Sequence, residues 1–275
     1  MINLDTFSKI GSQNKICQDY CIAEIEPFPY LILSDGCSSS LNTDVGARII
    51  CHLAKQYLFY NRNYLNKITQ ESLGNWVIHN AQLVAKQLDL NEDCLDATLI
   101  VCYPYSTRGK NFFKVIIYGD GYIIFKSPNN TYNTISVNYK PNKSYYLSYK
   151  LNYGRNETYY QMKITKKIIY DVPFESKPPA SVEIAYDSPF EMEIDLDKKE
   201  DYRCIFLCTG GIESFLNGDT KVTKVELNNI IDEFFAFKTT DGEFLKRGIP
   251  IVLKSLESSG ITHYDDLTIG AILLG

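Results

Sequence analysis

The spacing of apolar residues predicts that the chain begins with strands and continues into two helices. Short apolar runs at 17–24 and 30–33, the second leading into Ser34-Asp35-Gly36, predict two strands. Four apolar residues then recur at every fourth position, which places them on one face of a helix: Val45, Ile49, Leu53 and Tyr57. A second helix is predicted from about 73 to 88, with six residues on its buried face: Leu73, Trp76, Val77, Leu83, Val84 and Leu88.

Beyond residue 97 the period changes to that of strands. Short β-branched and aromatic runs bounded by turn residues predict three of them: 98–103, 112–118 and 122–126. The stretch 132–197 is rich in Tyr and Lys, alternates and is broken by prolines, so we expect hairpins there. The remaining elements are a buried strand, two amphipathic helices and a closing strand: 204–208, 225–237, 244–256 and 267–274. This order indicates an α+β fold in which helices cover sheets.

Length and composition favour one folded domain over 1–275, with a hairpin-rich insertion at about 132–197. The 275 residues exceed the usual ~100–200 per domain, but single domains reach ~250. Hydrophobic residues make up 45% of the chain and charged residues 22%, as in ordinary globular proteins. Disordered and collagen-like structures are therefore excluded.

The charge pattern argues against two classes of partner. The net charge is −5 and no long basic run occurs, so electrostatic capture of nucleic acid is not expected. No apolar run reaches the ~18 residues of a membrane-spanning helix, and residues 1–10 lack the pattern of a signal peptide. We therefore expect a cytoplasmic protein with no membrane partner; the oligomeric state is not indicated.

The cysteines do not predict a metal site of their own. None of the eight forms a C-x-x-C pair, and the chain has only three histidines, so a zinc site of the usual kind is not expected. Most of the cysteines lie in apolar runs, where Cys acts as a small core residue.

Aspartates at the ends of predicted strands are the chemical signal of this sequence. Asp19 begins one strand, Asp35 ends the next, Asp120 lies between two, and Asp265-Asp266 precede the last. Converging carboxylates without His or thiolate suit Mg²⁺ or Mn²⁺, and two such ions can activate water for displacement at phosphorus. Each Asp-Gly taken alone is more often a turn than a metal ligand, so only the ordered set is specific.

That ordered set resembles the metal-dependent protein phosphatases (PPM, or type 2C serine/threonine phosphatases). The sequences of the motifs are most similar to those of a bacterial branch of this family. The resemblance covers almost the whole chain and rests on six motifs in order: Gly11-Ser-Gln-Asn-Lys-Ile-Cys-Gln18-Asp19, Leu31-Ile-Leu-Ser34-Asp35-Gly36, Asp96-Ala97-Thr98-Leu99, Gly119-Asp120-Gly121, Thr209-Gly210-Gly211 and Asp265-Asp266-Leu267-Thr268.

The resemblance implies a four-layer αββα sandwich and a metal-dependent hydrolysis of phosphoserine or phosphothreonine, in a phosphorylated protein or a small phosphoester. It implies two Mn²⁺ or Mg²⁺ ions and a third, weaker one, with a metal-bridging water as the nucleophile. Asp35 would bridge the two ions and the carbonyl of Gly36 would be a ligand. Asp265 would bind the first ion, Asp19 would hold water at the second, and Asp120 would serve the third. Asp19, Asp35 and Asp265 would thus carry catalysis.

Two positions depart from the family pattern. Gly210 stands where the family has an aspartate that would ligate the first and third ions, and Asn14 stands where it has a phosphate-clamping arginine. Glu213 is a candidate replacement for the missing carboxylate, but a solvated glutamate is the favoured interpretation. Lys15 would point away from the site if residues 11–19 were a strand. His263 is either a general acid or, in the favoured interpretation, a surface histidine.

Two functions remain open. One is an active phosphatase, supported by the four aspartates; the other is a catalytically weak or inactive pseudophosphatase that serves as a binding or regulatory module, supported by Gly210 and Asn14. A nucleotide-binding enzyme is excluded, because Gly119-Asp-Gly121 lacks a third glycine and no G-K-[ST] occurs.

Overall fold

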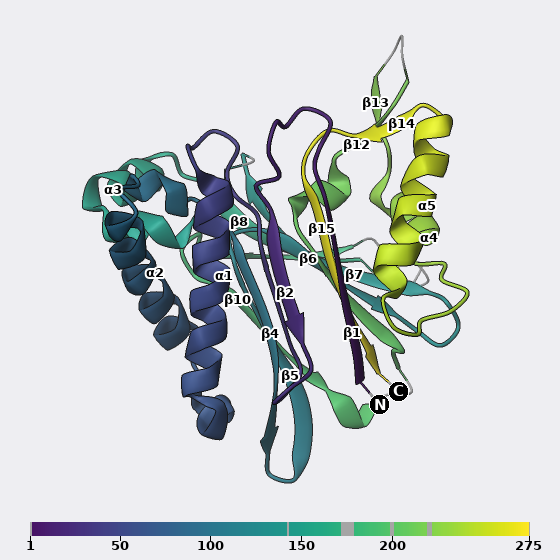
Figure 1. Ribbon diagram of the computed structural model, residues 1–275, viewed down its shortest axis with the longest axis horizontal. Helices are drawn as coiled ribbons and strands as arrows, with labels where there is room; N and C mark the ends of the chain where they lie inside the picture. The colour runs from purple at the N-terminus through teal and green to yellow at the C-terminus, as the bar shows by residue number, and fades with distance from the viewer. Residues whose placement is uncertain (1, 142, 172–178, 199–200, 219–221, 275) are drawn as a thin grey trace.

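Two antiparallel sheets pack face to face, and a pair of helices covers the outer face of each (Figure 1). The computed structural model describes residues 2–141, 143–171, 179–198, 201–218 and 222–274. The predicted αββα sandwich is therefore confirmed.

The strands of the two sheets come from all parts of the chain. The seven-stranded sheet has the order β1 (Ile2–Lys9), β15 (Leu267–Leu274), β11 (Cys204–Cys208), β6 (Gly121–Lys126), β7 (Tyr132–Lys140), β8 (Thr165–Asp171) and β9 (Ala180–Ile184). The five-stranded sheet has the order β10 (Phe190–Asp195), β5 (Lys110–Tyr118), β4 (Leu99–Thr107), β3 (Tyr30–Ser34) and β2 (Tyr20–Glu24). A small third sheet contains β13 (Thr223–Lys224), β12 (Phe215–Asn217) and β14 (Ile261–His263).

The central strands are apolar throughout because both of their faces are covered. In β3, Leu31 and Leu33 enter the core between the sheets, whereas Ile32 packs under the helices on the other side. In β11, Leu207 faces the opposite sheet and Phe206 faces the second helix pair. The strand period of two thus distributes each strand between two cores.

The helices have bounds close to the predicted ones. On one side lie α1 (Thr43–Tyr60) and α2 (Gln70–Gln87), and on the other α4 (Leu227–Phe234) and α5 (Phe244–Ser258). Short 3₁₀ helices connect several elements: η1 (Arg62–Lys67), η2 (Glu92–Leu95), η3 (Leu147–Leu151), η4 (Leu196–Lys198) and η5 (Gly210–Glu213). Within the described ranges, we find no helix that is both long and apolar enough for a membrane span.

The predicted helix faces need correction. On α1 the stripe that begins with Val45 is only half-buried, and the fully buried apolar side chains are those of Ala47, Ile50, Cys51, Ala54 and Leu58. On α2, Leu83 and Leu88 are 59% and 54% exposed, and small residues such as Ala81 and Ala85 are buried instead. Small side chains allow the helices to pack closely, which leaves the larger leucines at the margin.

The interpretation of 132–197 as hairpins that extend a sheet holds for β7, β8 and β9, which pair antiparallel, but not for the rest of the stretch. The helix α3 (Tyr153–Gln161) lies between β7 and β8 in the sequence, and β10 pairs with β5 in the five-stranded sheet. The sequence of α3 is polar and buries only Tyr159, so it lacks an aliphatic helical stripe. The strand β1, which pairs with β15, was also not predicted, and β2 begins at Tyr20 rather than at residue 17. Part of the stretch, 172–178, lies outside the described residues.

Candidate metal centre

The four aspartates of the sequence motifs come together at one end of the two sheets. Asp19 immediately precedes β2 and Asp35 immediately follows β3; because Tyr20 pairs with Ser34, the two aspartates lie at the same end. Asp120 occupies the turn between β5 and β6, and Asp265 precedes β15. The charges of Asp19, Asp120 and Asp265 all act on the carboxylate of Asp35, which places it at the centre of the group.

The backbone around Asp35 is fixed by the neighbouring strand. Asp35 N–H donates to the Thr98 hydroxyl at 3.0 Å, and its carbonyl accepts from Thr98 N–H at 2.8 Å. The next residue must be glycine, because a Cβ on Gly36 would lie 2.9 Å from the carbonyl oxygens of both Gln18 and Thr43. The Asp35-Gly36 dipeptide is therefore held rigidly between the two chain segments beside it.

Asp19 is buried beside Asp35 and carries an oxygen without a partner. Its Oδ2 accepts from the Thr209 hydroxyl at 2.9 Å, whereas its Oδ1 has no hydrogen-bond partner among the described residues. Burial, opposed by bonds from Thr268 and Thr209, raises the pKa of Asp19 to about 7. A buried acceptor that is left unpaired costs free energy, so this oxygen favours a ligand.

Burial and mutual repulsion act on the other carboxylates in the same direction. The pKa of Asp35 is raised well above its ordinary value, first by burial and then by the charges of Asp19, Asp120 and Asp265. Burial also raises the pKa of Asp120, although the hydroxyl of Ser144 donates to its Oδ1 and opposes the shift. Without a cation, Asp19 and Asp35 would share a proton, because two adjacent buried carboxylates resist ionising together.

The two aspartates of the last motif have different roles. The buried Asp266 accepts from Gly11 N–H at 2.7 Å and from Gln18 N–H at 2.5 Å, so it holds the opening motif against β15. Asp265 is contacted by the side-chain amide of Asn14 at 3.4 Å. Residues 11–19 form turns and not a strand, so the argument from strand geometry for Lys15 is wrong, although its side chain is exposed.

Gly210 lies directly over the acidic group. A Cβ at this position would lie 3.1 Å from Asp120 Oδ2 and 3.6 Å from Asp35 Oδ2, so both carboxylates border the space that a side chain would enter. Glu213 does not enter it, because its Oε2 pairs with Lys224 Nζ at 2.8 Å. The favoured interpretation of Glu213 as a surface carboxylate agrees with this ion pair.

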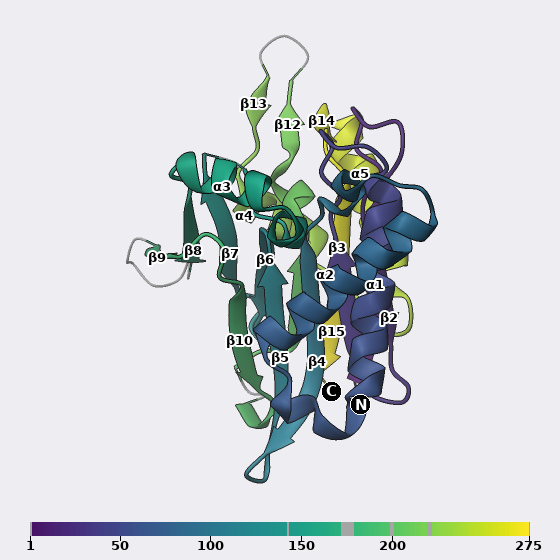
Figure 2. The same ribbon diagram turned by 90° about the vertical axis from the view of Figure 1, so that its left-hand side faces the viewer.

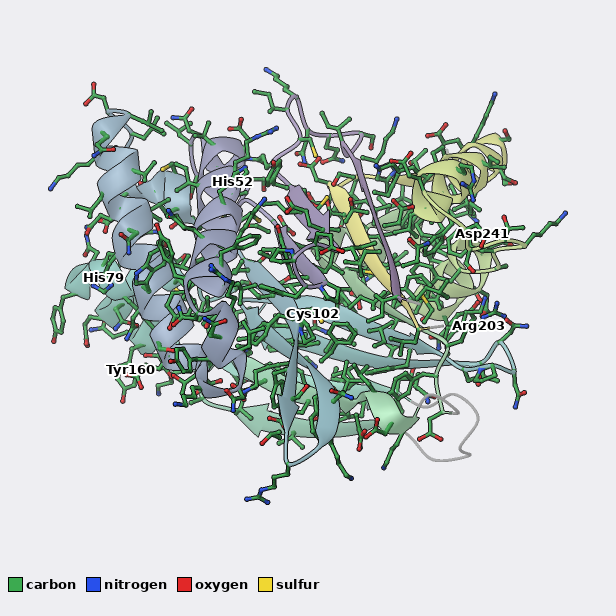
Figure 3. The ribbon with its side chains drawn as sticks, turned by 60° about the horizontal axis from the view of Figure 1, so that its bottom comes forward. His52, His79, Cys102, Tyr160, Arg203 and Asp241 are labelled. Atoms are coloured by element: carbon green, nitrogen blue, oxygen red, sulfur yellow. The ribbon has the colours of Figure 1, made fainter. Side chains whose placement is uncertain are left out.

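The donor set fits a hard cation, although its side chains are not closed around one. Within the described residues, no three His, Cys, Asp or Glu side chains are arranged as a finished metal site. The nearby thiol of Cys17 stays protonated, because burial and the charges of Asp266, Asp19 and Asp35 raise its pKa to about 12. His52 and His79 lie on α1 and α2 (Figure 3). The four aspartates offer carboxylate oxygens, and these are ligands for Mg²⁺ or Mn²⁺ rather than zinc.

Several residues of the site were not predicted. In the segment before η3, Ser144 donates to Asp120 and Tyr146 lies near Asp120 and Asp35, and no motif marked either residue. Tyr146 lies beside the thiol of Cys37, and burial followed by the charges of its neighbours, Asp120 and Asp35 among them, raises its pKa well above the ordinary value. Its phenol therefore stays protonated and can donate a hydrogen bond.

His263 is buried and not a surface residue, which corrects the favoured interpretation. Only 4% of it is exposed, and its ring stacks on Phe215 with 5.6 Å between centroids. Burial, followed by the charge of Lys9, lowers its pKa, so the imidazole is neutral.

Known proteins resemble this chain in sequence pattern and in fold. A family model described as "Protein phosphatase 2C" matches residues 9–250. No curated protein matches the chain. The serine/threonine phosphatase Stp1 from Staphylococcus aureus superposes with a TM-score of 0.55 at 14% identity, covering 100% of this chain and 96% of its own. The serine/threonine phosphatase of S. agalactiae gives a TM-score of 0.52 at 12% identity, covering 100% of both chains. At these identities the structural likeness shows the fold.

Proposed function

Because the chain belongs to the protein phosphatase 2C family, we propose that it hydrolyses phosphoserine and phosphothreonine, in proteins or as small phosphoesters, with Mn²⁺ or Mg²⁺. The observation that carries the proposal is the convergence of Asp35 and Asp120 on the space beside Gly210, with Asp19 and Asp265 next to them. A buried group of like charges is costly without a cation, so its presence supports metal binding.

Each residue would have a distinct task in this reaction. When bound, two cations would activate a water molecule and neutralise the phosphoryl oxygens. Asp35, the carbonyl of Gly36 and Asp265 would hold these cations, and Asp120 would serve a weaker third. The free Oδ1 of Asp19 would accept a hydrogen bond from the attacking water. Thr209 would keep Asp19 in position through the bond to its other oxygen.

The second candidate is a binding module with the same fold and weak or no catalysis. It is favoured by the missing carboxylate at Gly210 and by Asn14, whose amide contacts Asp265 and provides no positive charge for a phosphate. We further propose that the protein is cytoplasmic and forms a single domain over 1–275; the eight cysteines, all free thiols, support a reducing compartment.

Hydrolysis assays with the purified chain test the two candidates against each other. We expect Mn²⁺-dependent release of phosphate from phosphoserine and phosphothreonine peptides and from p-nitrophenyl phosphate, and no release by Asp35→Asn. If neither substrate is hydrolysed but a phosphopeptide binds saturably, the binding module is the correct function. If neither hydrolysis nor binding occurs, both proposals fail.

A further inference from the structure

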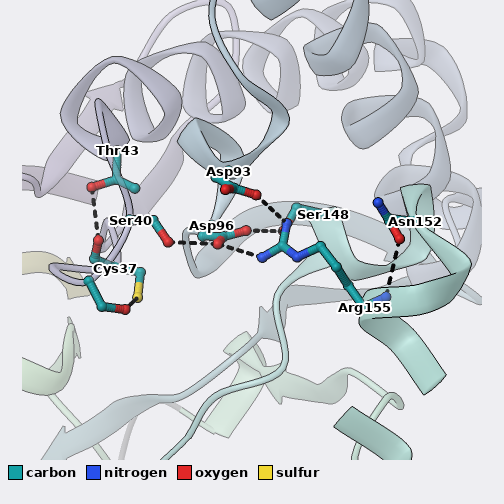
Figure 4. Close-up of polar contacts among 9 residues, drawn as sticks. Cys37, Ser40, Thr43, Asp93, Asp96, Ser148, Asn152 and Arg155 are labelled. Carbon is teal, nitrogen blue, oxygen red and sulfur yellow. Dashed lines mark hydrogen bonds and ion pairs between the residues drawn. The ribbon is translucent and has the colours of Figure 1, made fainter. Parts of the chain in front are cut away.

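A buried carboxylate outside the acidic group ties three segments of the chain together. Asp96, which is 2% exposed, accepts from the hydroxyls of Ser40 and Ser148 at 2.8 and 2.6 Å and from the Arg155 guanidinium at 2.6 Å (Figure 4). Its backbone carbonyl accepts from Cys37 N–H at 2.8 Å. Asp96 therefore connects the loop after Asp35-Gly36 with the segment that contains η3 and α3.

Arg155 is the charged partner of Asp96 among the described residues. Its Nη1 lies 3.1 Å from Asp93 Oδ1, whereas Nη2 faces Asp96. The guanidinium thus lies between a carboxylate within η2 and the one that directly follows it. The N-terminus of α3 is fixed by the Asn152 side chain, which accepts from Arg155 N–H at 3.1 Å, and the guanidinium lies over the Tyr149 ring at 4.5 Å. A planar guanidinium held between two carboxylates orients its helix as well as neutralising charge.

The same segment delivers two side chains to the acidic group. Ser144 donates to Asp120 Oδ1, and Tyr146 lies beside the thiol of Cys37, near enough to Asp35 and Asp120 for their charges to act on its phenol. Figure 2 shows α3 lying across the ends of β7 and β8. Within the segment, Tyr159 donates to the carbonyl of Lys143 at 2.5 Å and Tyr145 to Asn156 at 3.1 Å, so residues 143–161 hold together as a unit.

We propose that Arg155 is a positioning residue, which holds residues 144–151 against the acidic group so that the Tyr146 hydroxyl contacts the phosphoester. The contact with the phosphoester rests on the proposed function, whereas the positioning does not. Tyr146 would supply a neutral donor in a site where Asn14 provides no cation for the phosphate. Arg155 would thereby set substrate affinity without touching the substrate.

Hydrogen exchange tests the positioning without any need for activity. Arg155→Met should raise backbone exchange of residues 144–151 about tenfold or more, because one buried charge loses its partner. Lys150→Met, an exposed substitution in the same segment, should leave exchange unchanged. Asp96→Asn/Arg155→Met removes the unpaired charge, so its melting temperature should recover while exchange stays fast. Unchanged exchange in Arg155→Met, or exchange that recovers together with the melting temperature, would overturn the proposal.

Kinetics with a phosphopeptide test the contact of Tyr146. Tyr146→Phe and Arg155→Met should each raise KM several-fold with a smaller effect on kcat, and the double variant should be no worse than the poorer single variant, because both act through one hydroxyl. If the increases in KM of the two single variants multiply in the double variant, the role of Tyr146 is refuted, even if the exchange data support positioning. If the parent protein hydrolyses nothing with Mn²⁺, the proposed function and the Tyr146 contact fail, and exchange alone decides whether Arg155 positions the segment.

Discussion

The charges of three other aspartates act on Asp35. Its substitution should therefore weaken metal binding but raise the melting temperature when no metal is present. Asp35→Asn should abolish detectable Mn²⁺ binding in calorimetry, because it removes the central carboxylate. In chelator the variant should melt at a higher temperature than the parent, since it no longer has to bury a charge or take up a proton on folding. The matched control is Asp197→Asn at an exposed position of η4, which should change neither quantity. Unchanged Mn²⁺ binding in Asp35→Asn would refute the site.

Gly210 permits a gain-of-function test. Gly210→Asp should tighten Mn²⁺ binding and raise phosphatase activity about tenfold or more, because it adds a carboxylate beside Asp35 and Asp120. No left-handed backbone opposes the change, since φ at Gly210 is not positive. The new charge should lower the melting temperature in chelator and raise it with Mn²⁺, because ligand binding stabilises the folded state.

The control for this variant is Gly210→Ala, which fills the same space near Asp120 without adding a ligand. It should bind Mn²⁺ no better than the parent. If the metal-induced rise in melting temperature is equal in Gly210→Asp and Gly210→Ala, then position 210 is not where a ligand is missing.

Residues of the candidate site differ in how far the sequence could predict them. Asp19, Asp35, Asp120 and Asp265 lie in ordered motifs at strand ends, so pattern and resemblance together located them. Ser144 and Tyr146 come from an irregular segment whose approach depends on tertiary contacts, and no spacing marks them. Asp266 could be predicted as part of a motif, but its bonds to Gly11 and Gln18 needed the folded loop.

At the scale of elements, β8 carries a buried lysine whose loss of a proton on folding should control stability at alkaline pH. Lys166 is 1% exposed, and its ammonium donates to the Ser188 carbonyl at 3.0 Å and lies 5.3 Å from the Tyr139 ring. Burial lowers the pKa of Lys166 to about 7, although the facing charges of Asp120 and Asp187 oppose the shift. Between pH 7 and the ordinary lysine pKa near 10.5, the unfolded chain therefore binds more protons than the folded one.

Stability in chelator should consequently gain a favourable contribution as the pH rises from 7 to about 10. Lys166→Met should remove this contribution and should stabilise the protein at pH 6.5 by about 1–4 kcal/mol, because a buried charge is replaced by an apolar side chain. Urea unfolding at pH 6.5 and 9.5 measures both effects, and Lys167→Met, which loses only the ion pair with Glu183, is the control. An equal pH dependence in Lys166→Met and the parent would contradict the assignment.

Elements could be predicted from sequence where one period dominates. The strands around Ile32 and Phe206 are buried on both faces, so their apolar runs identified them. The helix α3 was missed because tyrosine packing and the Asn152 cap hold it, without an aliphatic stripe. Leu83 and Leu88 were assigned to the buried face because hydrophobicity was taken as burial, whereas close packing of α2 buries alanines instead.

At the scale of the whole molecule, the layers are joined by strands that serve two cores at once. The core under α1 and α2 and the core under α4 and α5 each contain residues of strands whose other face lies in the core between the sheets. Disruption of one layer therefore removes the support of the next. We expect the four layers and the three cores between them to unfold as one cooperative unit, as a single domain would.

Cysteines buried in each layer provide the measurement. Cys51 and Cys94 lie under α1 and α2, Cys102 lies between the sheets (Figure 3), and Cys204 and Cys208 lie under α4 and α5. In native buffer these five thiols should react with a maleimide only through unfolding, so all five should be labelled at one common rate, which mass spectrometry of digested samples can resolve. Under denaturing, non-reducing conditions all eight cysteines should react, because each is a free thiol.

Two separate rates of labelling in native buffer, one for Cys51 and Cys94 and another for Cys204 and Cys208, would mean that the helix pairs unfold independently and that 1–275 is not one cooperative domain. A shortfall below eight in the denatured sample would indicate a disulfide and contradict the cytoplasmic location.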